Sequence, residues 1–170
     1  MALFKKRPFF PTTNAGRYVA SFLVGAIGAS AMGPLYIWPA LLISLSAFWV
    51  MFTEFSDQPK WKSFLVGWLY GFGFFVNGLY WIGNALLVDG NPYQWVYPLA
   101  VCGLPAMLAL FPACAALTLR LVSLGRRLTN YLLFVFVFFA FEYLRGHIFT
   151  GFPWNLTGMA WTGSLPMLQI

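Results

Sequence analysis

The run SFLVGWLYGFGFFVNGLYWIGNALLV, residues 63–88, holds 26 uncharged residues in a chain of 170. At ~1.5 Å per residue, a helix of this length crosses the ~30 Å hydrocarbon core of a bilayer with some tilt. Gly67 and Gly71 lie at GxxxG spacing within it, which lets a second helix approach the backbone closely. The run therefore predicts a transmembrane helix that packs against a neighbour.

Similar apolar runs fill most of the chain. The sequence is 61% hydrophobic, 21% aromatic and 8% charged, with a mean hydropathy of +0.75. These values exclude an ordinary soluble globule and predict an integral membrane protein. Residues 18–53 form an uncharged run too long for one crossing, and Gly33-Pro34 and Trp38-Pro39 predict a break between two antiparallel spans.

Two more runs follow towards the C-terminus. Residues 93–119 predict a fourth span, which prolines at 98, 105 and 112 should bend repeatedly in one direction. Residues 128–141 are too short to cross unless they extend through Leu144, which puts Glu142 at the rim of the bilayer.

We therefore expect an all-α polytopic membrane protein with about five transmembrane helices, a periplasmic re-entrant or interfacial segment and the start of a further span. The expected spans are residues 18–33, 36–53, 63–88, 94–119 and 126–144. They divide the chain into a cytoplasmic basic N-terminus (1–17), a membrane helix bundle (18–144) and a periplasmic-side segment that begins the next apolar stretch (145–170).

The basic residues predict the orientation. If the N-terminus is cytoplasmic, the following nine of the ten Lys and Arg residues fall on that side: Lys5, Lys6, Arg7, Arg17, Lys60, Lys62, Arg120, Arg126 and Arg127. Arg145 is the exception, and we expect it to have a specific partner. The net charge of +6 is then explained by the membrane topology, with the basic residues facing anionic lipid, and nucleic acid is not an expected partner.

The basic N-terminus followed by Ala29-Ser30-Ala31 also fits a cleaved signal peptide.

The stretch FEYLRGHIFTGFPW, residues 141–154, is the candidate functional site. It gathers Glu142, Arg145 and the single histidine, His147, within six residues of an otherwise apolar chain. The alternative interpretation is a polar helix cap followed by a turn at the membrane surface. We expect His147 to be a polar residue at the membrane interface rather than a catalytic base.

The two asparagines of the third span allow two interpretations, and the two cysteines indicate no chemical role. Asn77 and Asn84 lie seven residues apart and predict either interhelical hydrogen bonds or a polar lining that faces a lipid headgroup or substrate. Cys102 and Cys114 lie in one apolar run without metal-ligand spacing and are expected to be plain buried thiols. No metal or cofactor is expected.

Taken in order, these motifs resemble the N-terminal membrane domain of bacterial apolipoprotein N-acyltransferases. The resemblance rests on Gly33-Pro34 with Trp38-Pro39-Ala40, on Gly71-Phe72-Gly73 with Trp81, and on Glu142, Leu144-Arg145-Gly146 and Thr150-Gly151-Phe152-Pro153-Trp154. It implies an enzyme of the bacterial inner membrane that moves a fatty acyl chain from a phospholipid to the N-terminal amine of a diacylglyceryl-lipoprotein. The implied partners are the phospholipid donor, the lipoprotein acceptor and membrane lipids.

In that family the catalytic Glu, Lys and Cys belong to a nitrilase-like periplasmic domain that follows the spans. The sequence ends at Ile170 before any such domain, so we expect a C-terminally truncated chain that is inactive alone and has no catalytic residue. Cys102 and Cys114 are not assigned as the nucleophile, because an apolar setting opposes thiolate formation.

The resemblance leaves a supporting or lipid-binding role for a set of residues in the candidate stretch. We expect Arg145 to attract a phosphate or to pair with Glu142, and Phe152, Pro153 and Trp154 to form a rigid rim near the acyl chains. Thr150 and Gly151 complete the set. The alternative is a noncatalytic membrane module, such as part of a transporter or a recruiting subunit. No intramembrane charge pair or inverted repeat favours it.

Overall fold

The computed structural model describes residues 8–55, 58–123, 127–148 and 154–169, and within these ranges every regular element is helical. The α-helices are α1 Asn14–Ala29, α2 Trp38–Glu54, α3 Lys60–Leu79, α4 Tyr97–Leu108, α5 Leu110–Val122 and α6 Arg127–His147. Short 3-10 helices complete the fold: η1 Tyr80–Leu86, η2 Gln94–Val96, η3 Thr157–Trp161 and η4 Leu165–Gln169. The expected all-α class is confirmed.

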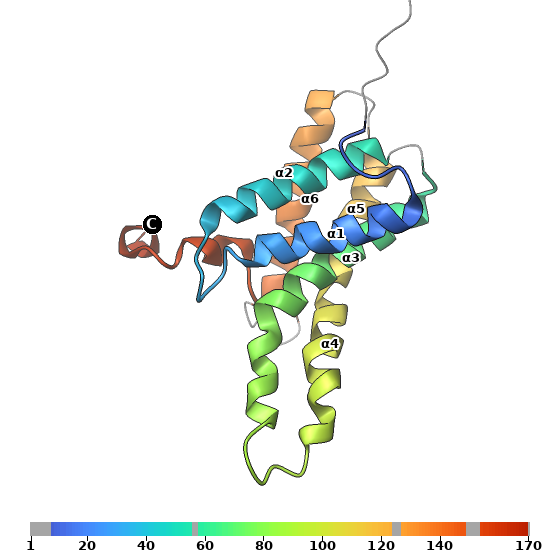
Figure 1. The fold of residues 1–170 in the computed structure, drawn as a ribbon. Coiled ribbons are helices and arrows are strands. Elements are labelled where there is room, and N and C mark those ends of the chain that lie inside the picture. The colour runs from blue at the N-terminus through green and yellow to red at the C-terminus, as the bar shows by residue number, and fades with distance from the viewer. Residues whose placement is uncertain (1–7, 56–57, 124–126, 149–153, 170) are drawn as a thin grey trace, which may run out of the picture.

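Helix α3 is the central element of the bundle (Figure 1). Its most extensive contacts are with α1 and with α5, while α2 packs on α1 and α6 packs on α5. Beyond these contacts, α3 and α4 continue as a hairpin that projects from the rest of the molecule, with η1 and η2 at its end (Figure 1). The C-terminal segment leaves on another side and contacts α2 through η3.

The helix ends follow the local sequence. Thr13 caps α1, because its hydroxyl oxygen accepts a hydrogen bond from the Gly16 N–H at 3.2 Å. Pro39 lies in the first turn of α2, where its missing N–H costs nothing. The connection between the two helices covers residues 30–37, close to the predicted break at 33–39.

Glycines let the backbone of α3 touch a helix on either side. A Cβ added at Gly25 would overlap the carbonyl oxygen of Tyr70, and one added at Gly73 would overlap that of Phe22, so α1 and α3 meet without side chains between them. A Cβ at Gly67 or Gly71 would overlap Pro112 of α5. The GxxxG pair thus makes the close helix contact that its spacing predicts.

The fourth apolar run forms two helices, α4 and α5, and its three prolines have different settings, with Pro105 inside α4. Pro98 lies in the first turn of α4, where proline fits without a kink. Pro112 lacks the N–H that would bond the carbonyl of Leu108, and the helix is interrupted next to it at Ala109. The indole N–H of Trp68 donates to the nearby carbonyl of Ala106 at 3.1 Å, so a neighbouring helix serves a backbone acceptor beside the break.

Within the described ranges, three helical stretches are long and apolar enough to cross a membrane: Lys60–Leu86, Gln94–Val122 and Leu128–His147. Helix α2 is apolar but shorter, with 17 residues, and α1 has 16. The protein is therefore a polytopic helical membrane protein. The division into five spans and three regions stays a prediction.

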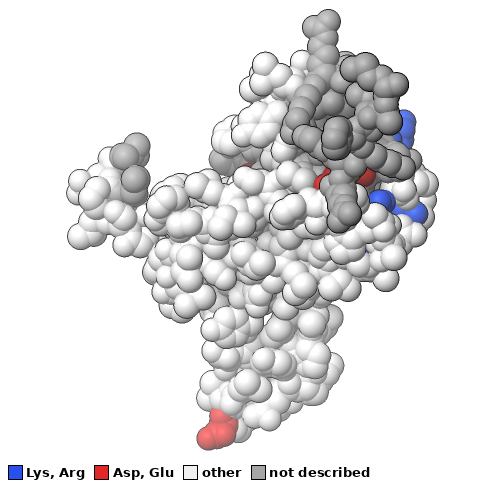
Figure 2. Space-filling view, turned by 45° about the horizontal axis from the view of Figure 1, so that its top comes forward, with Lys and Arg blue, Asp and Glu red and all other residues white. Residues whose placement is uncertain are grey.

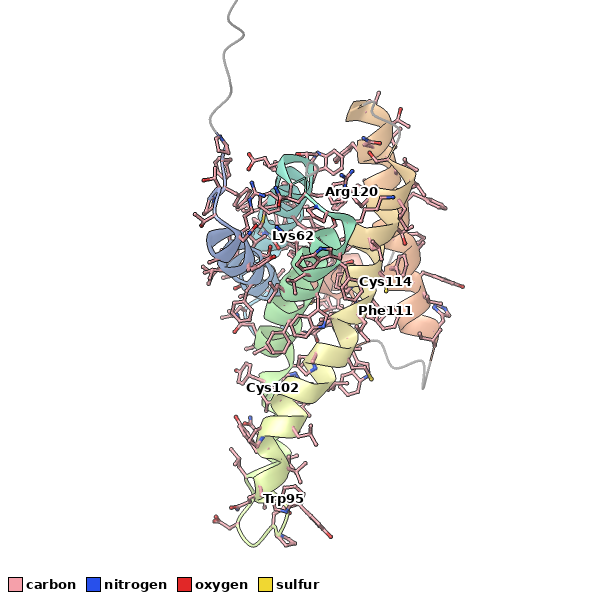
Figure 3. The ribbon with its side chains drawn as sticks, turned by 90° about the vertical axis from the view of Figure 1, so that its right-hand side faces the viewer. Lys62, Trp95, Cys102, Phe111, Cys114 and Arg120 are labelled. Carbon is pink, nitrogen blue, oxygen red and sulfur yellow. The ribbon has the colours of Figure 1, made fainter. Side chains whose placement is uncertain are left out.

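The basic side chains gather at one end of the bundle. Figure 2 shows blue atoms near one end of a face that is otherwise almost entirely uncharged, and Figure 3 places Lys62 and Arg120 at the end opposite Trp95. Lys62 bonds the side chain of Asn14 at 3.2 Å, and the Arg17 guanidinium lies 4.3 Å from the centroid of the Phe55 ring. The positions of Arg17, Lys62 and Arg120 agree with the side assigned to them from sequence, whereas Lys5, Lys6, Arg7 and Arg126 lie outside the described residues.

Replacing Gly73 with alanine should destabilise the bundle by about 1–3 kcal/mol, because the new methyl group forces α3 away from α1. Thermal unfolding in detergent measures the effect. Gly103→Ala in α4 is the matched control, since its Cβ would meet only the flexible end of Leu99. Equal unfolding temperatures for the two variants would contradict the close contact.

Candidate functional site

The candidate site forms around an ion pair at the end of α6. Glu142 and Arg145 lie one helical turn apart, and the Nη2 atom of Arg145 is 2.6 Å from Oε1 of Glu142. Arg145 is only 2% exposed, which is unusual for an arginine. A charge buried to this degree requires partners, so every contact of the guanidinium matters.

The other contacts of Arg145 come from the segment that follows α6. Its Nη1 donates to the carbonyl of Trp154, and Nη2 also donates to the carbonyl of Asn155 at 3.4 Å. The ring of Phe75 in α3 covers the guanidinium, with 4.8 Å between Cζ and the ring centroid. Arg145 thus joins α6, α3 and the returning chain.

Glu142 holds the same segment from the other side. Its second oxygen, Oε2, accepts a hydrogen bond from the backbone N–H of Thr157 at 2.9 Å. Asn155 adopts a left-handed conformation with φ 42°, which asparagine tolerates better than most residues. The chain can therefore reverse between its contacts with Arg145 and its contact with Glu142.

The predicted pairing of Glu142 with Arg145 is present in the structure, and its burial leaves little surface for the alternative, a phosphate on Arg145. Trp154 is partly buried against the core cluster that includes Phe74, Phe75 and Leu79. Thr150, Gly151, Phe152 and Pro153 lie outside the described residues. The roles expected for all seven site residues stay predictions.

His147 and the two asparagines have ordinary surroundings. His147 is exposed, stacks on the Tyr143 ring with 3.9 Å between centroids, and has Nδ1 2.7 Å from the Tyr143 carbonyl oxygen. Asn77 donates to the carbonyl of Ala26 at 3.4 Å, which is the expected interhelical bond, and it also borders a shallow hollow beside Ser30. Asn84 is exposed on η1.

A narrow, mostly apolar crevice with room for about one water molecule is bordered by Glu142 and Thr157. Its walls come from α3, α5 and α6: Tyr70, Gly71, Phe74, Phe75, Phe111, Pro112, Ala115, Phe138 and Phe141. The Tyr70 hydroxyl lies 3.1 Å from Ser44 Oγ, which itself donates to the carbonyl of Val24 at 2.7 Å. The polar atom of Tyr70 is therefore satisfied inside the protein, and the crevice is left to apolar ligands.

A second, wholly apolar groove lies outside the crevice. It has a volume of about 200 Å³ and is lined by Met107, Leu110, Phe111, Cys114, Phe141 and Leu144. Phe111 and Phe141 border both hollows, and Figure 3 shows Phe111 and Cys114 together on α5. Two phenyl rings thus separate an outer groove from the crevice that reaches the ion pair.

Sequence reasoning missed several members of this site. Phe75, Asn155 and Thr157 contribute a ring face, a carbonyl oxygen and an N–H, and no residue pattern marks such contacts. Cys102 and Cys114 are free thiols on α4 and α5, but Cys102 is exposed on the protein surface and Cys114 is half-buried, so the expectation of two buried thiols was wrong. No three His, Cys, Asp or Glu side chains in the described ranges come together in a way that could hold a metal ion.

These features define a class: a helical membrane module with a buried ion pair beside a narrow apolar crevice and an outer apolar groove. Residues 24–170 match the family model described as the apolipoprotein N-acyltransferase N-terminal domain. The chain belongs to the apolipoprotein N-acyltransferase family.

Individual relatives agree with this assignment. The apolipoprotein N-acyltransferase of Rhodopseudomonas palustris is 42% identical over 156 residues, which cover 90% of this chain and 29% of that protein. The Brucella melitensis protein of the same name is 46% identical over 154 residues, covering 85% of this chain and 28% of that protein. The chain thus spans less than a third of the length of these relatives.

Glu142→Gln should lower the free energy of unfolding by about 3 kcal/mol, because it leaves the buried Arg145 charge unpaired. Asp89→Asn is the matched control, since Asp89 is exposed at the far end of the α3–α4 hairpin. Chemical denaturation in detergent compares the two. A Glu142→Gln protein as stable as the control would show that the pair does not hold the segment.

Proposed function

We propose that this chain is the membrane domain of an apolipoprotein N-acyltransferase of the bacterial inner membrane, with its N-terminus in the cytoplasm. The reaction is transfer of a fatty acyl chain from a phospholipid to the N-terminal amine of a diacylglyceryl-cysteine lipoprotein. Family membership supports the reaction class. The gathering of basic side chains at one end of the bundle supports the orientation.

The observation that carries the proposal is the pair of apolar hollows that leads to Glu142. The outer groove has no polar lining residue, so it suits a hydrocarbon chain and not a headgroup. The narrow inner crevice shares Phe111 and Phe141 with this groove and is bordered by Glu142. An acyl chain that enters from the bilayer would have its ester end near the side of the membrane where α6 terminates.

We assign the bond-making chemistry to residues outside this chain. A nucleophile requires a base within hydrogen-bond reach, and in the described part of the chain no hydrogen bond joins Cys102 or Cys114 to a base. The chain spans only 29% of the Rhodopseudomonas palustris relative, which leaves most of that protein to supply a catalytic Glu, Lys and Cys set. By this proposal the chain alone is inactive.

The ion pair then has a positioning role. Arg145 and Glu142 hold the chain from Trp154 to Thr157 through hydrogen bonds to its backbone. The stretch from Thr150 to Trp154, predicted to lie near the acyl chains, would be presented from this anchored segment. A positioned rim matters because a misplacement of ~1 Å can cost a large factor in rate.

Cys114→Trp should fill the outer groove and reduce transfer from long-chain donors by about tenfold, with a smaller effect on short-chain donors. The assay uses a full-length chimera in which this chain replaces the matching region of the Brucella melitensis relative. Leu121→Trp, at an exposed position of the same helix, is the control. Equal chain-length profiles for the two variants would exclude the groove as the acyl site.

The same chimera tests the division of labour. It should N-acylate a diacylglyceryl-lipoprotein in membranes, measured by mass spectrometry of the lipoprotein N-terminus, while this chain expressed alone should give no transfer. Activity from the chain alone would overturn the assignment of chemistry elsewhere. A folded but inactive chimera would favour a noncatalytic membrane module.

A further inference from the structure

The end of the α3–α4 hairpin is a well-ordered turn. We call residues 80–99 the hairpin tip. Asn91 accepts a hydrogen bond from the N–H of Tyr93 at 2.9 Å and donates to the carbonyl of Leu86 at 3.3 Å. Gln94 donates to the carbonyl of Val88 at 3.4 Å. Gly83 lies directly against the ring of Tyr97, where a Cβ would not fit, so the two arms are closely packed.

This rigid turn displays large apolar side chains. Trp95 is 76% exposed, and the other exposed members are Tyr80, Trp81, Leu87, Val88, Tyr93 and Leu99. Asp89 is the single charged residue between Lys62 and Arg120 in the sequence. Figure 2 shows the hairpin as uncharged along its visible length, with acidic atoms only at its end. Such an exposed apolar surface is unfavourable in water, so we expect lipid or another protein to cover it.

The length of the hairpin decides where the tip lies. Arg120 and Trp95 are at opposite ends of one helical stretch, as Figure 3 shows, and at ~1.5 Å per residue they are about 37 Å apart along it. At the common tilt of ~20°, this rise still exceeds the ~30 Å hydrocarbon core. With Arg120 at one interface, the tip reaches the headgroup layer of the opposite leaflet.

We propose that the hairpin tip is embedded in the headgroup layer of the leaflet away from the basic end, with its tryptophans and tyrosines as anchors. Its exposed surface continues along α4 into the lipid-facing side chains Leu99 and Met107, so one apolar surface runs from the span to the tip. Trp and Tyr are the side chains that suit this layer, because one end of each ring is apolar and the other forms hydrogen bonds. The anchored tip fixes the depth of α4 and α5, and with it the depth of the crevice.

Depth-dependent fluorescence quenching tests the proposal without using acyl transfer. A Cys102→Ser, Cys114→Ser protein with Val88→Cys carries an environment-sensitive label at the tip, with both tryptophans intact. Val135→Cys on α6 is the deep control and Thr12→Cys at the basic end is the aqueous control; both positions are exposed on the surface. The proteins are reconstituted in vesicles of phosphatidylethanolamine and phosphatidylglycerol.

The label at position 88 should be quenched more by shallow than by deep lipid-borne quenchers, and about threefold less by aqueous iodide than the label at position 12. Adding Trp81→Ala and Trp95→Ala should move it towards water. If iodide quenches the label at position 88 as strongly as the label at position 12, the hairpin tip is exposed to water, and a protein partner is then expected to cover its apolar surface. Unchanged quenching in the double alanine variant would also overturn the anchoring role.

Discussion

The bundle depends on the approach of α3 to two other helices at backbone distance. In a bilayer, lipid tails are as apolar as the side chains, so helices associate through packing and not through a hydrophobic driving force. Gly25 and Gly73 remove the side chains between α1 and α3, and Gly67 and Gly71 do so between α3 and α5. With both contacts on one helix, α3 fixes the positions of Tyr70, Phe74 and Phe75, which form one wall of the crevice.

The site depends on a different constraint, the burial of one positive charge. A guanidinium that is 2% exposed cannot be left unpaired, and Arg145 finds a carboxylate, two carbonyl oxygens and a ring face. Three of these four partners lie outside α6. The ordering of residues 154–157 and the closed end of the crevice therefore both follow from the same charge.

The close helix contacts of α3 and the buried charge of Arg145 both suit a positioning role for the described residues and not a role in making or breaking bonds. The described residues offer apolar hollows, an aromatic hairpin tip and a rigidly held return segment, all of which suit the positioning of a lipid and its membrane depth. Such an arrangement lets a membrane domain contribute to transfer by orientation, while reactive groups are held elsewhere.

The sequence by itself determined the all-α membrane class, the close approach at Gly67 and Gly71, and the proximity of Glu142 to Arg145, because hydropathy, small-residue spacing and a separation of one helical turn are local properties. It did not distinguish the three prolines of the fourth run, of which Pro98 lies at a helix start where it fits unstrained and Pro105 lies inside α4. Only the tertiary structure decided that Arg145 is buried, that Phe75 and Thr157 belong to the site, and that Phe111 and Phe141 divide two hollows. These contacts join residues far apart in the chain through ring faces and backbone atoms, which leave no pattern in the order of amino acids.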